Sequence, residues 1–153
     1  MEFRIRAMAD ADAELVAAWR YPDEHAFHDP GADADGRAAL LDPDARGDAF
    51  WAVDSGSAGL VGYYSFARDH GDLEINLGLR PDLTGHGLGA AFLAAGLDFA
   101  RDHFAPTRFV VWVATFDARA ITVSERAGFR HGRVRTRAAR GTEWEFLEMT
   151  RPA

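Results

Sequence analysis

The pattern of apolar and polar positions is most regular at residues 73–80, where it alternates strictly and predicts a β-strand. One face carries only leucine and isoleucine: Leu73, Ile75, Leu77 and Leu79. The opposite face carries Glu74, Asn76, Gly78 and Arg80, because successive side chains of a strand point to opposite sides. Glu74 is therefore expected to lie away from the apolar face of its strand.

Helical periodicity replaces this alternation at two places. From Leu88 to Phe104 the apolar residues recur every three or four positions, which predicts a helix with a broad buried face. The segment Asp10–Arg20 has a shorter repeat of the same kind. We expect its apolar side to consist of Ala11, Leu15, Ala18 and Trp19.

Shorter apolar runs between turn residues predict the remaining elements. Strands are expected at Phe3–Arg6, Ala49–Asp54, Leu60–Ala67, Phe109–Ala114, Phe129–Thr136 and Glu143–Thr150. The last two form a hairpin around Gly141. A helix at Ala118–Ala127 ends at Gly128, which suits position C′. Residues 21–48 are expected to form a loop with a short helix near Arg37–Leu41.

Length and composition favour one domain that spans residues 1–153. A chain of 153 residues that is 48% hydrophobic can bury a single core. No stretch approaches the roughly 18 apolar residues of a spanning helix, and residues 1–6 show no apolar signal segment. We expect a cytoplasmic protein without a membrane partner. The lack of cysteine excludes disulfides and thiolate metal sites.

Acidic residues are concentrated in one segment. The formal net charge is −7, which argues against a partner bound through nucleic-acid phosphates. Residues 21–48 hold eight acids against two bases, Arg37 and Arg46. The acids are Asp23, Glu24, Asp29, Asp33, Asp35, Asp42, Asp44 and Asp48. Such a surface of one sign attracts cations and raises their rate of encounter.

A glycine cluster joins the alternating strand to the long helix, in the order Thr84-Gly85-His86-Gly87-Leu88-Gly89. Glycine lets a ligand approach the backbone closely, and the N–H groups of a helix N-terminus favour an anion. The cluster therefore predicts a phosphate or pyrophosphate site, with a plain tight turn as the alternative. No Gly-Lys-Ser/Thr motif follows, and several strands precede the cluster, so a P-loop and a Rossmann unit fit poorly.

Taken together, these motifs resemble the GNAT superfamily of N-acetyltransferases. The resemblance rests on residues 74–81, 84–89 and 111–113, then on Asp117, 120–121 and 127–129. Residues 117–121 and 125–129 are similar to the ribosomal-protein N-terminal and antibiotic acetyltransferase branches. The implied fold is an α/β (α+β) GNAT fold. It has a mixed, mostly antiparallel sheet flanked by helices and splayed between the fourth and fifth strands.

The resemblance also implies a co-substrate, acetyl-CoA, and residues that bind it. The pyrophosphate would be held by backbone amides of Gly85, His86, Gly87, Leu88, Gly89 and Ala90. The pantetheine arm would lie along Leu77, Gly78 and Leu79, with the N–H near Leu77 polarising the thioester carbonyl. Thr84 stands where relatives carry Gln or Arg, and Asp117 where they carry Asn. Both are assigned to the cofactor site, and Asp117 also suits a helix N-cap.

Two residues are candidate catalytic groups. Many GNAT members carry a glutamate at the position of Glu74 that acts as a base on the amine through water; the alternative is a solvent-facing carboxylate. Ser124 stands where many relatives have a tyrosine that protonates the leaving CoA thiolate. A serine is a poor acid, but a thiol of pKa about 8.5 leaves readily without help. Tyr63 and Tyr64 are possible substitutes or simply packed aromatics.

The expected partner is an acceptor with a primary amine. A peptide α-amine, a polyamine, an aminoglycoside or a small metabolite all stay open, and the acidic segment is expected to cover the acceptor side. The resemblance also allows a homodimer. No metal is expected, although His25 and His28 among carboxylates are a weak metal-ligand pattern. A catalytically silent GNAT module that binds acyl-CoA or amine, and a nucleotide-binding protein, are the alternatives.

Overall fold

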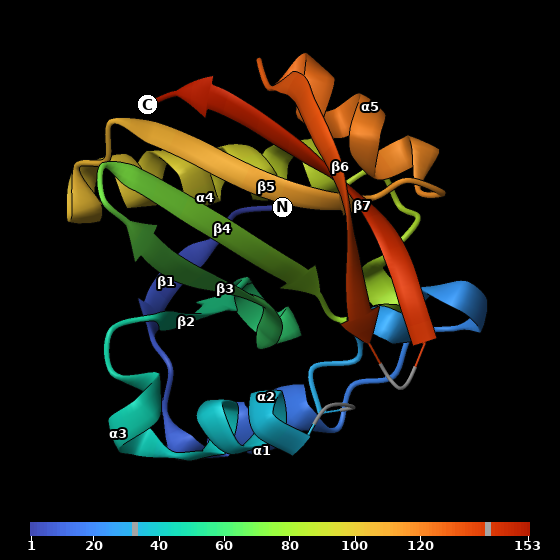
Figure 1. Cartoon of the computed structure of the whole chain (residues 1–153). Helices are drawn as coiled ribbons and strands as arrows, with labels where there is room; N and C mark the ends of the chain where they lie inside the picture. Colours follow the sequence, from blue (N-terminus) through green and yellow to red (C-terminus); the bar gives the residue numbers. More distant parts are fainter. Residues whose placement is uncertain (32–33, 140–141) are drawn as a thin grey trace. The chain divides into compact units, whose positions relative to one another are not determined.

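The computed structural model describes residues 1–31, 34–139 and 142–153 (Figure 1). Seven strands are assigned in it: β1 (Arg4–Ala7), β2 (Phe50–Asp54), β3 (Leu60–Asp69), β4 (Asp72–Leu79), β5 (Arg108–Ala114), β6 (Arg130–Ala139) and β7 (Thr142–Pro152). The helices are α1 (Asp10–Ala17), α2 (Ala34–Leu41), α3 (Pro43–Arg46), α4 (Gly89–Phe104) and α5 (Ala118–Arg126). Short 3₁₀ turns are η1 (Asp23–His28), η2 (Gly56–Ala58) and η3 (Pro81–Leu83).

The strands form one sheet in the order β1-β2-β3-β4-β5-β7-β6. β4 and β5 are parallel, whereas β1–β2, β2–β3, β5–β7 and β6–β7 are antiparallel. The register of β4 with β5 ends at the pair Glu74–Val110, although β4 continues to Leu79 and β5 to Ala114. A mixed, mostly antiparallel sheet, splayed between the fourth and fifth strands and flanked by helices, is therefore confirmed. The hairpin turn predicted at Gly141 lies outside the described residues.

The chain contains two compact units. The first comprises Met1–Ser65 with Leu77–His86, and the second Phe66–Asn76 with Gly87–Ala153. In the first, α1 and α2 lie side by side (Figure 1) and cover a core of Met8, Ala13, Val16, Ala17, Leu40 and Ala52. In the second, α4 buries Phe92, Leu93, Leu97, Ala100 and Phe104, which confirms its broad apolar face. No helix in the described part of the chain is long and apolar enough to span a membrane.

The predicted apolar side of α1 is wrong except for Trp19, which follows the helix and packs against the core. Ala11 and Ala18 are exposed, and Leu15 keeps 57% of its surface accessible. Ala13, Val16 and Ala17 face the core instead. They are also spaced three and four residues apart, so periodicity alone allowed either side of this alanine-rich helix. A polar contact at Asp12 fixes the side that is buried.

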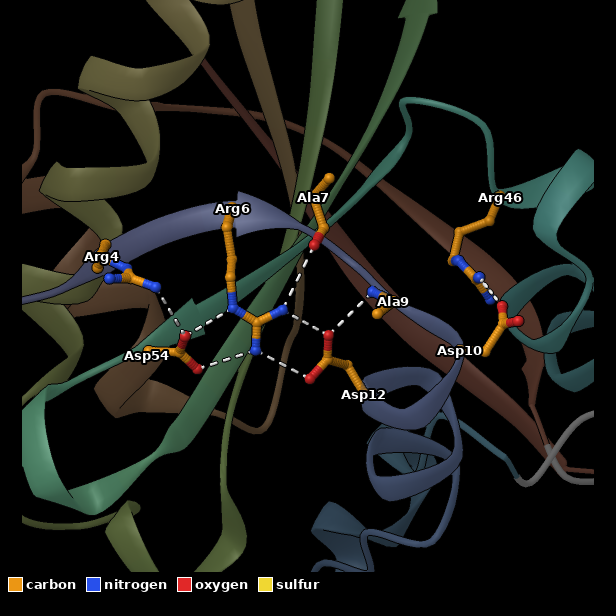
Figure 2. A network of polar contacts seen from close by, with 8 residues as sticks. All are labelled: Arg4, Arg6, Ala7, Ala9, Asp10, Asp12, Arg46 and Asp54. Atoms are coloured by element: carbon orange, nitrogen blue, oxygen red, sulfur yellow. Dashed lines mark hydrogen bonds and ion pairs between the residues drawn. The ribbon is translucent and has the colours of Figure 1, made fainter.

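Asp12 belongs to a network of charged groups at the start of α1 (Figure 2). The guanidinium of Arg6 donates to both Asp12 oxygens at 2.6 and 2.9 Å and to both Asp54 oxygens at 2.6 and 3.1 Å. Asp12 also accepts the N–H of Ala9, the residue at the N-cap of α1, at 2.9 Å. The Arg6 hydrogen bonds hold the pKa of Asp12 below its usual range. Because Asp12 is tied to β1 in this way, the next turn of α1 turns Ala13 and Val16 inward.

Residues 21–48 are more helical than predicted. The short helix expected near Arg37–Leu41 is confirmed as part of α2, but η1 and α3 also fall within the segment, so the expectation of only one short helix is wrong. The signals were weak because α3 has four residues and begins with Pro43, a residue suited to the first helical turn. Asp42 caps α3 by accepting the Asp44 N–H at 3.0 Å. Arg46 is buried, and it donates to the Leu40 carbonyl at 2.6 Å and pairs with Asp10 (Figure 2).

Candidate functional site

The glycine cluster forms an open backbone turn at the start of α4. Gly85 and Gly87 have φ angles of 77° and 78°, which L-residues rarely adopt. A Cβ atom added to Gly87 would meet no atom within 4 Å. The N-cap residue of α4 is Leu88, which has no capping side chain, and no acid lies in the first turn. The first N–H groups of the helix are therefore available to an anion.

Side chains around this turn leave the backbone accessible. The Thr84 hydroxyl donates to the Pro81 carbonyl at 2.7 Å and closes η3. His86 is exposed. The pKa of the nearby Asp82 carboxyl is lowered mainly by the hydrogen bond from Arg80, and to a smaller extent by the charge of His86. In the second unit, Gly89 faces α5, where the nearest atom to an added Cβ is Val123 Cγ2 at 3.8 Å. The start of α4 and the helix that carries Ser124 thus lie together.

The second half of β4 presents backbone groups away from β3. The Arg80 N–H donates to the Val61 carbonyl of β3 at 2.8 Å. In a trans peptide the preceding carbonyl points the opposite way, and the structure contains no cis bond among its described residues. The Leu79 carbonyl therefore points away from β3, and the two-residue repeat of a strand gives Leu77 the same direction. This is the edge along which a strand-like ligand can pair.

Tyr21 occupies part of that edge, and sequence reasoning missed it. Its hydroxyl donates to the Leu79 carbonyl at 2.6 Å. Its own backbone N–H donates to Asp29 Oδ1 at 2.7 Å, and the Asp29 side chain is only 2% exposed. Burial is the main cause that raises the pKa of Tyr21, and the charges of the nearby Tyr63 and Asp29 raise it further. The Tyr21 hydroxyl therefore stays protonated at neutral pH. A contact across 58 positions leaves no local sequence signal.

Glu74 lies where the pairing of β4 with β5 ends. It is half-buried, and its register partner Val110 is the last one on β5. Among the described residues its carboxylate accepts one hydrogen bond, a long one of 3.4 Å from the Asn76 amide. The carboxylate is held loosely and is not locked in an ion pair. Its lone pairs are therefore available to a water molecule or an amine.

Ser124 and Asp117 both belong to α5. Ser124 is buried, at 6% exposure, and its carbonyl accepts the N–H groups of Ala127 and Phe129 at the end of the helix. The Asp117 carboxylate accepts the Ala120 N–H at 3.1 Å and caps the helix. The expectation that Asp117 can act as an N-cap is confirmed. A role toward the cofactor stays a prediction for both residues.

The remaining candidate residues are two tyrosines of β3 and two histidines of η1. Tyr64 is fully buried, whereas Tyr63 is half-buried on the other side of β3. His25 and His28 lie in η1, and the ring of His28 meets that of Tyr21 edge-on at 6.4 Å. Within the described ranges, no three His, Asp or Glu side chains are grouped so that they could hold a metal ion.

Solved structures with the same fold include N-acetyltransferases. A chimera of the Vibrio cholerae spermidine N-acetyltransferase SpeG with hSSAT has a TM-score of 0.81 at 16% identity, covering 99% of this chain and 96% of that one. The Vibrio cholerae enzyme in complex with CoA and spermine gives 0.79 at 15%, with 98% and 95% covered. A putative phosphinothricin N-acetyltransferase gives 0.74 at 13%, with 99% and 98% covered. At these identities the likeness shows the fold.

The sequence itself gives the family. No curated protein matches the chain. The model of the acetyltransferase (GNAT) domain matches residues 2–130, which include β1 to α5 and both the glycine cluster and Glu74. The resemblance inferred from the motifs is confirmed at the level of the superfamily. The chain belongs to the acetyltransferase (GNAT) domain family and is an N-acetyltransferase by that membership.

Proposed function

We propose that this chain transfers the acetyl group of acetyl-CoA to a primary amine by direct attack in a ternary complex. The observation that carries the proposal is the backbone turn at Gly85–Gly89, which leaves its N–H groups uncapped at the start of α4. The family match covers this turn. A similar structure was determined in complex with CoA and spermine. We also propose that residues 1–153 act as one acetyltransferase domain.

The backbone of this chain fits acetyl-CoA at two places. The N–H groups from Gly85 to Ala90 would bind the pyrophosphate, which the helix N-terminus favours by roughly 0.3–1 kcal/mol beyond the hydrogen bonds themselves. The edge of β4 from Leu77 to Leu79 would pair with the pantetheine amides. Bound there, the thioester supplies an activated acyl group. The Leu77 N–H would polarise its carbonyl oxygen, and one such donor is worth roughly 2.7–4 kcal/mol in other enzymes.

Glu74 is the proposed base. An α-amine has a pKa near about 8 and a lysine-type amine near about 10.4, so most acceptors arrive protonated. Glu74 would accept that proton, directly or through water, before the amine nitrogen bonds to the acyl carbon. The loosely held carboxylate described above can do this, because it has no ion-pair partner among the described residues. The proton then leaves Glu74 to solvent.

The leaving group needs little help from this chain. As the carbon–nitrogen bond forms, the carbon–sulfur bond breaks and its electron pair stays on sulfur. CoA departs as a thiolate, since a thiol pKa of about 8.5 makes it a good leaving group, and the nitrogen, which is positively charged after the attack, loses its second proton to solvent to give the neutral amide. Ser124 is proposed to lie near that sulfur without acting as an essential acid. Its side chain is buried in α5.

The acidic segment, residues 21–48, is proposed to attract the acceptor. Its exposed carboxylates include Glu24, Asp35, Asp44 and Asp48. Asp29 does not belong to that set, because it is buried and holds the Tyr21 N–H. Electrostatic attraction of this kind weakens with salt. A cationic aliphatic amine is the acceptor class that fits best.

The function is tested by incubating the protein with acetyl-CoA and a panel of amines. The panel includes polyamines, peptides with a free α-amine, aminoglycosides and small metabolites. CoA release is followed with a thiol reagent, and products are identified by mass spectrometry. We expect an acetylated amine formed in a one-to-one ratio with CoA. Tight acetyl-CoA binding without turnover of any amine would indicate a silent binding module instead.

A further inference from the structure

The ring of Tyr63 lies directly over Gly78 in β4. A Cβ atom built on Gly78 would come within 2.4 Å of Tyr63 Cε1 and 3.1 Å of its hydroxyl oxygen. The first distance is shorter than any real Cβ contact, so only glycine allows the ring to lie there. Tyr63 comes from β3, where Ala52 of β2 is its register partner. The glycine and the phenol together shape this part of the β4 surface.

The Tyr63 hydroxyl has no hydrogen-bond partner among the described residues, in contrast to Tyr21, whose hydroxyl is bound to Leu79. In the same residues no buried side-chain nitrogen or oxygen lacks a partner. The Tyr63 hydroxyl therefore keeps a small accessible area, although its ring is packed against the core of the first unit and burial is sufficient to raise the pKa of the phenol.

The position of this hydroxyl separates it from the strand edge. The Leu79 carbonyl points away from β3 within the sheet, where a strand-like ligand pairs. The side-chain direction at Gly78 is perpendicular to that, out of the sheet. The Tyr63 hydroxyl thus stands above the backbone between Leu77 and Leu79. A nucleophile attacks a carbonyl carbon from above or below the carbonyl plane, so this is one of the two sides from which an amine can approach.

The chemistry of the attack decides which hydrogen bond is useful. The amine lone pair must stay free for the acyl carbon, so a donor to nitrogen would block the reaction and an acceptor of an N–H would orient it. A phenol oxygen can accept such a bond. Burial raises the pKa of Tyr63 to about 12, so the group stays neutral. The Trp19 ring lies 6.2 Å from that of Tyr63 and adds an aromatic surface beside it.

We propose that Tyr63 binds the acceptor: its hydroxyl oxygen accepts an N–H of the primary amine beside the ring that covers Gly78, and the Trp19 ring contacts the alkyl part of the same molecule. The inference rests on the proposed function, because it requires an amine that is acetylated. It goes beyond that function by naming a binding residue. Neither the glycine cluster nor the candidate base takes part in it.

The test compares wild type with Tyr63→Phe, which keeps the ring and removes only the hydroxyl. We expect the KM for the best amine of the panel to rise about three- to tenfold, the range of one neutral hydrogen bond. The KM for acetyl-CoA, the pH profile and the melting temperature should stay unchanged. A merely structural hydroxyl would change the melting temperature and leave the amine KM as it was.

Three outcomes decide the matter. An unchanged amine KM in an active, folded Tyr63→Phe enzyme overturns the proposal while the acetyltransferase function stands. A raised KM for acetyl-CoA alone assigns the hydroxyl to the co-substrate and also overturns it. Wild-type protein that acetylates no amine of the panel refutes the proposed function, and the role of Tyr63 with it.

Discussion

The glycine cluster and the network around Arg6 are both polar regions beside a helix start, but they treat their hydrogen-bonding groups in opposite ways. At α1, the first turn carries two acids, Asp10 and Asp12, and Asp12 is bound by Arg6, which also holds Asp54 (Figure 2). At α4, the first turn carries no acid, and no side chain caps the helix. One helix start already holds carboxylates of the protein itself, and the other is left open to an anion from outside.

This difference separates a structural charge cluster from a candidate binding site. A satisfied network offers nothing to a ligand, and breaking it leaves a charge without its partner. Open N–H groups at a helix start contribute little to the fold but bind an anion well. We therefore expect substitutions at the two helix starts to affect different properties. Changes at α4 should remove ligand binding, and changes at α1 should reduce stability.

The largest effect is expected for Gly87→Glu. A carboxylate placed among the open N–H groups repels a pyrophosphate and fills its space, so binding of acetyl-CoA measured by calorimetry should be lost. The matched control is Gly59→Glu in the β2–β3 turn. Gly59 also has a positive φ, 69°, with no atom within 4 Å of an added Cβ. The control also places a glutamate at a positive φ and should bind normally. Equal affinities of the two variants would refute the assignment of the cluster.

Glu74→Gln is expected to have the next largest effect. Glutamine keeps the shape and the hydrogen bond with Asn76 but cannot accept a proton at neutral pH. kcat/KM for the amine should fall by about 10² to 10⁴, the range for a positioned base, with acetyl-CoA binding unchanged. Initial rates over a range of pH provide the measurement. A variant with the wild-type rate and pH profile would return Glu74 to the role of a surface carboxylate.

Asp12→Asn tests the network around Arg6. Loss of its charged hydrogen bonds to Arg6 should lower the free energy of unfolding by about 1.5–3 kcal/mol, with acetyl-CoA affinity unchanged. Because the folded pKa of Asp12 lies below its ordinary value, its contribution is complete above about pH 4 and is lost as the pH falls further. Urea unfolding at several pH values measures this.

A control for Asp12 is Asp69→Asn, which breaks an exposed pair with His70. Exposed pairs contribute between about 0 and 1 kcal/mol. If both variants lost the same stability, the network around Arg6 would not be special.

The smallest effect is expected for Ser124→Ala. The side chain is buried, and a serine hydroxyl transfers protons poorly, so kcat should fall less than tenfold, which is about 1.4 kcal/mol. Steady-state rates at saturating acetyl-CoA measure this. A loss of several hundredfold would mean that Ser124 takes part in the departure of CoA after all.

The elements that sequence reasoning predicted best are those with a dense local signal. The strict alternation at β4 allowed only a strand, and the wide apolar face of α4 allowed only a helix. The predicted ends of both elements agree with the structure within a residue or two. The glycine cluster was equally legible, because positive φ angles at Gly85 and Gly87 require glycine. The part of the candidate site that we propose to bind phosphate was therefore visible in the chain.

What the sequence did not show depends on contacts between distant residues. The buried side of α1 is decided by the Arg6–Asp12 pair and not by its alanines. The bond of Tyr21 to Leu79 and the packing of Tyr63 on Gly78 join segments that have no common pattern. Acceptor recognition depends on side chains of this kind. The amine was for that reason the part of the function that motifs left open.

The most direct test of the account is a two-substrate kinetic study with the best amine of the panel. Initial rates are measured while acetyl-CoA and amine are varied together, and the product is weighed by mass spectrometry. The account predicts intersecting double-reciprocal lines and an amine heavier by one acetyl group for each CoA released. Parallel lines, which indicate an acetylated enzyme intermediate, or CoA released without an acetylated amine, would contradict direct transfer in a ternary complex.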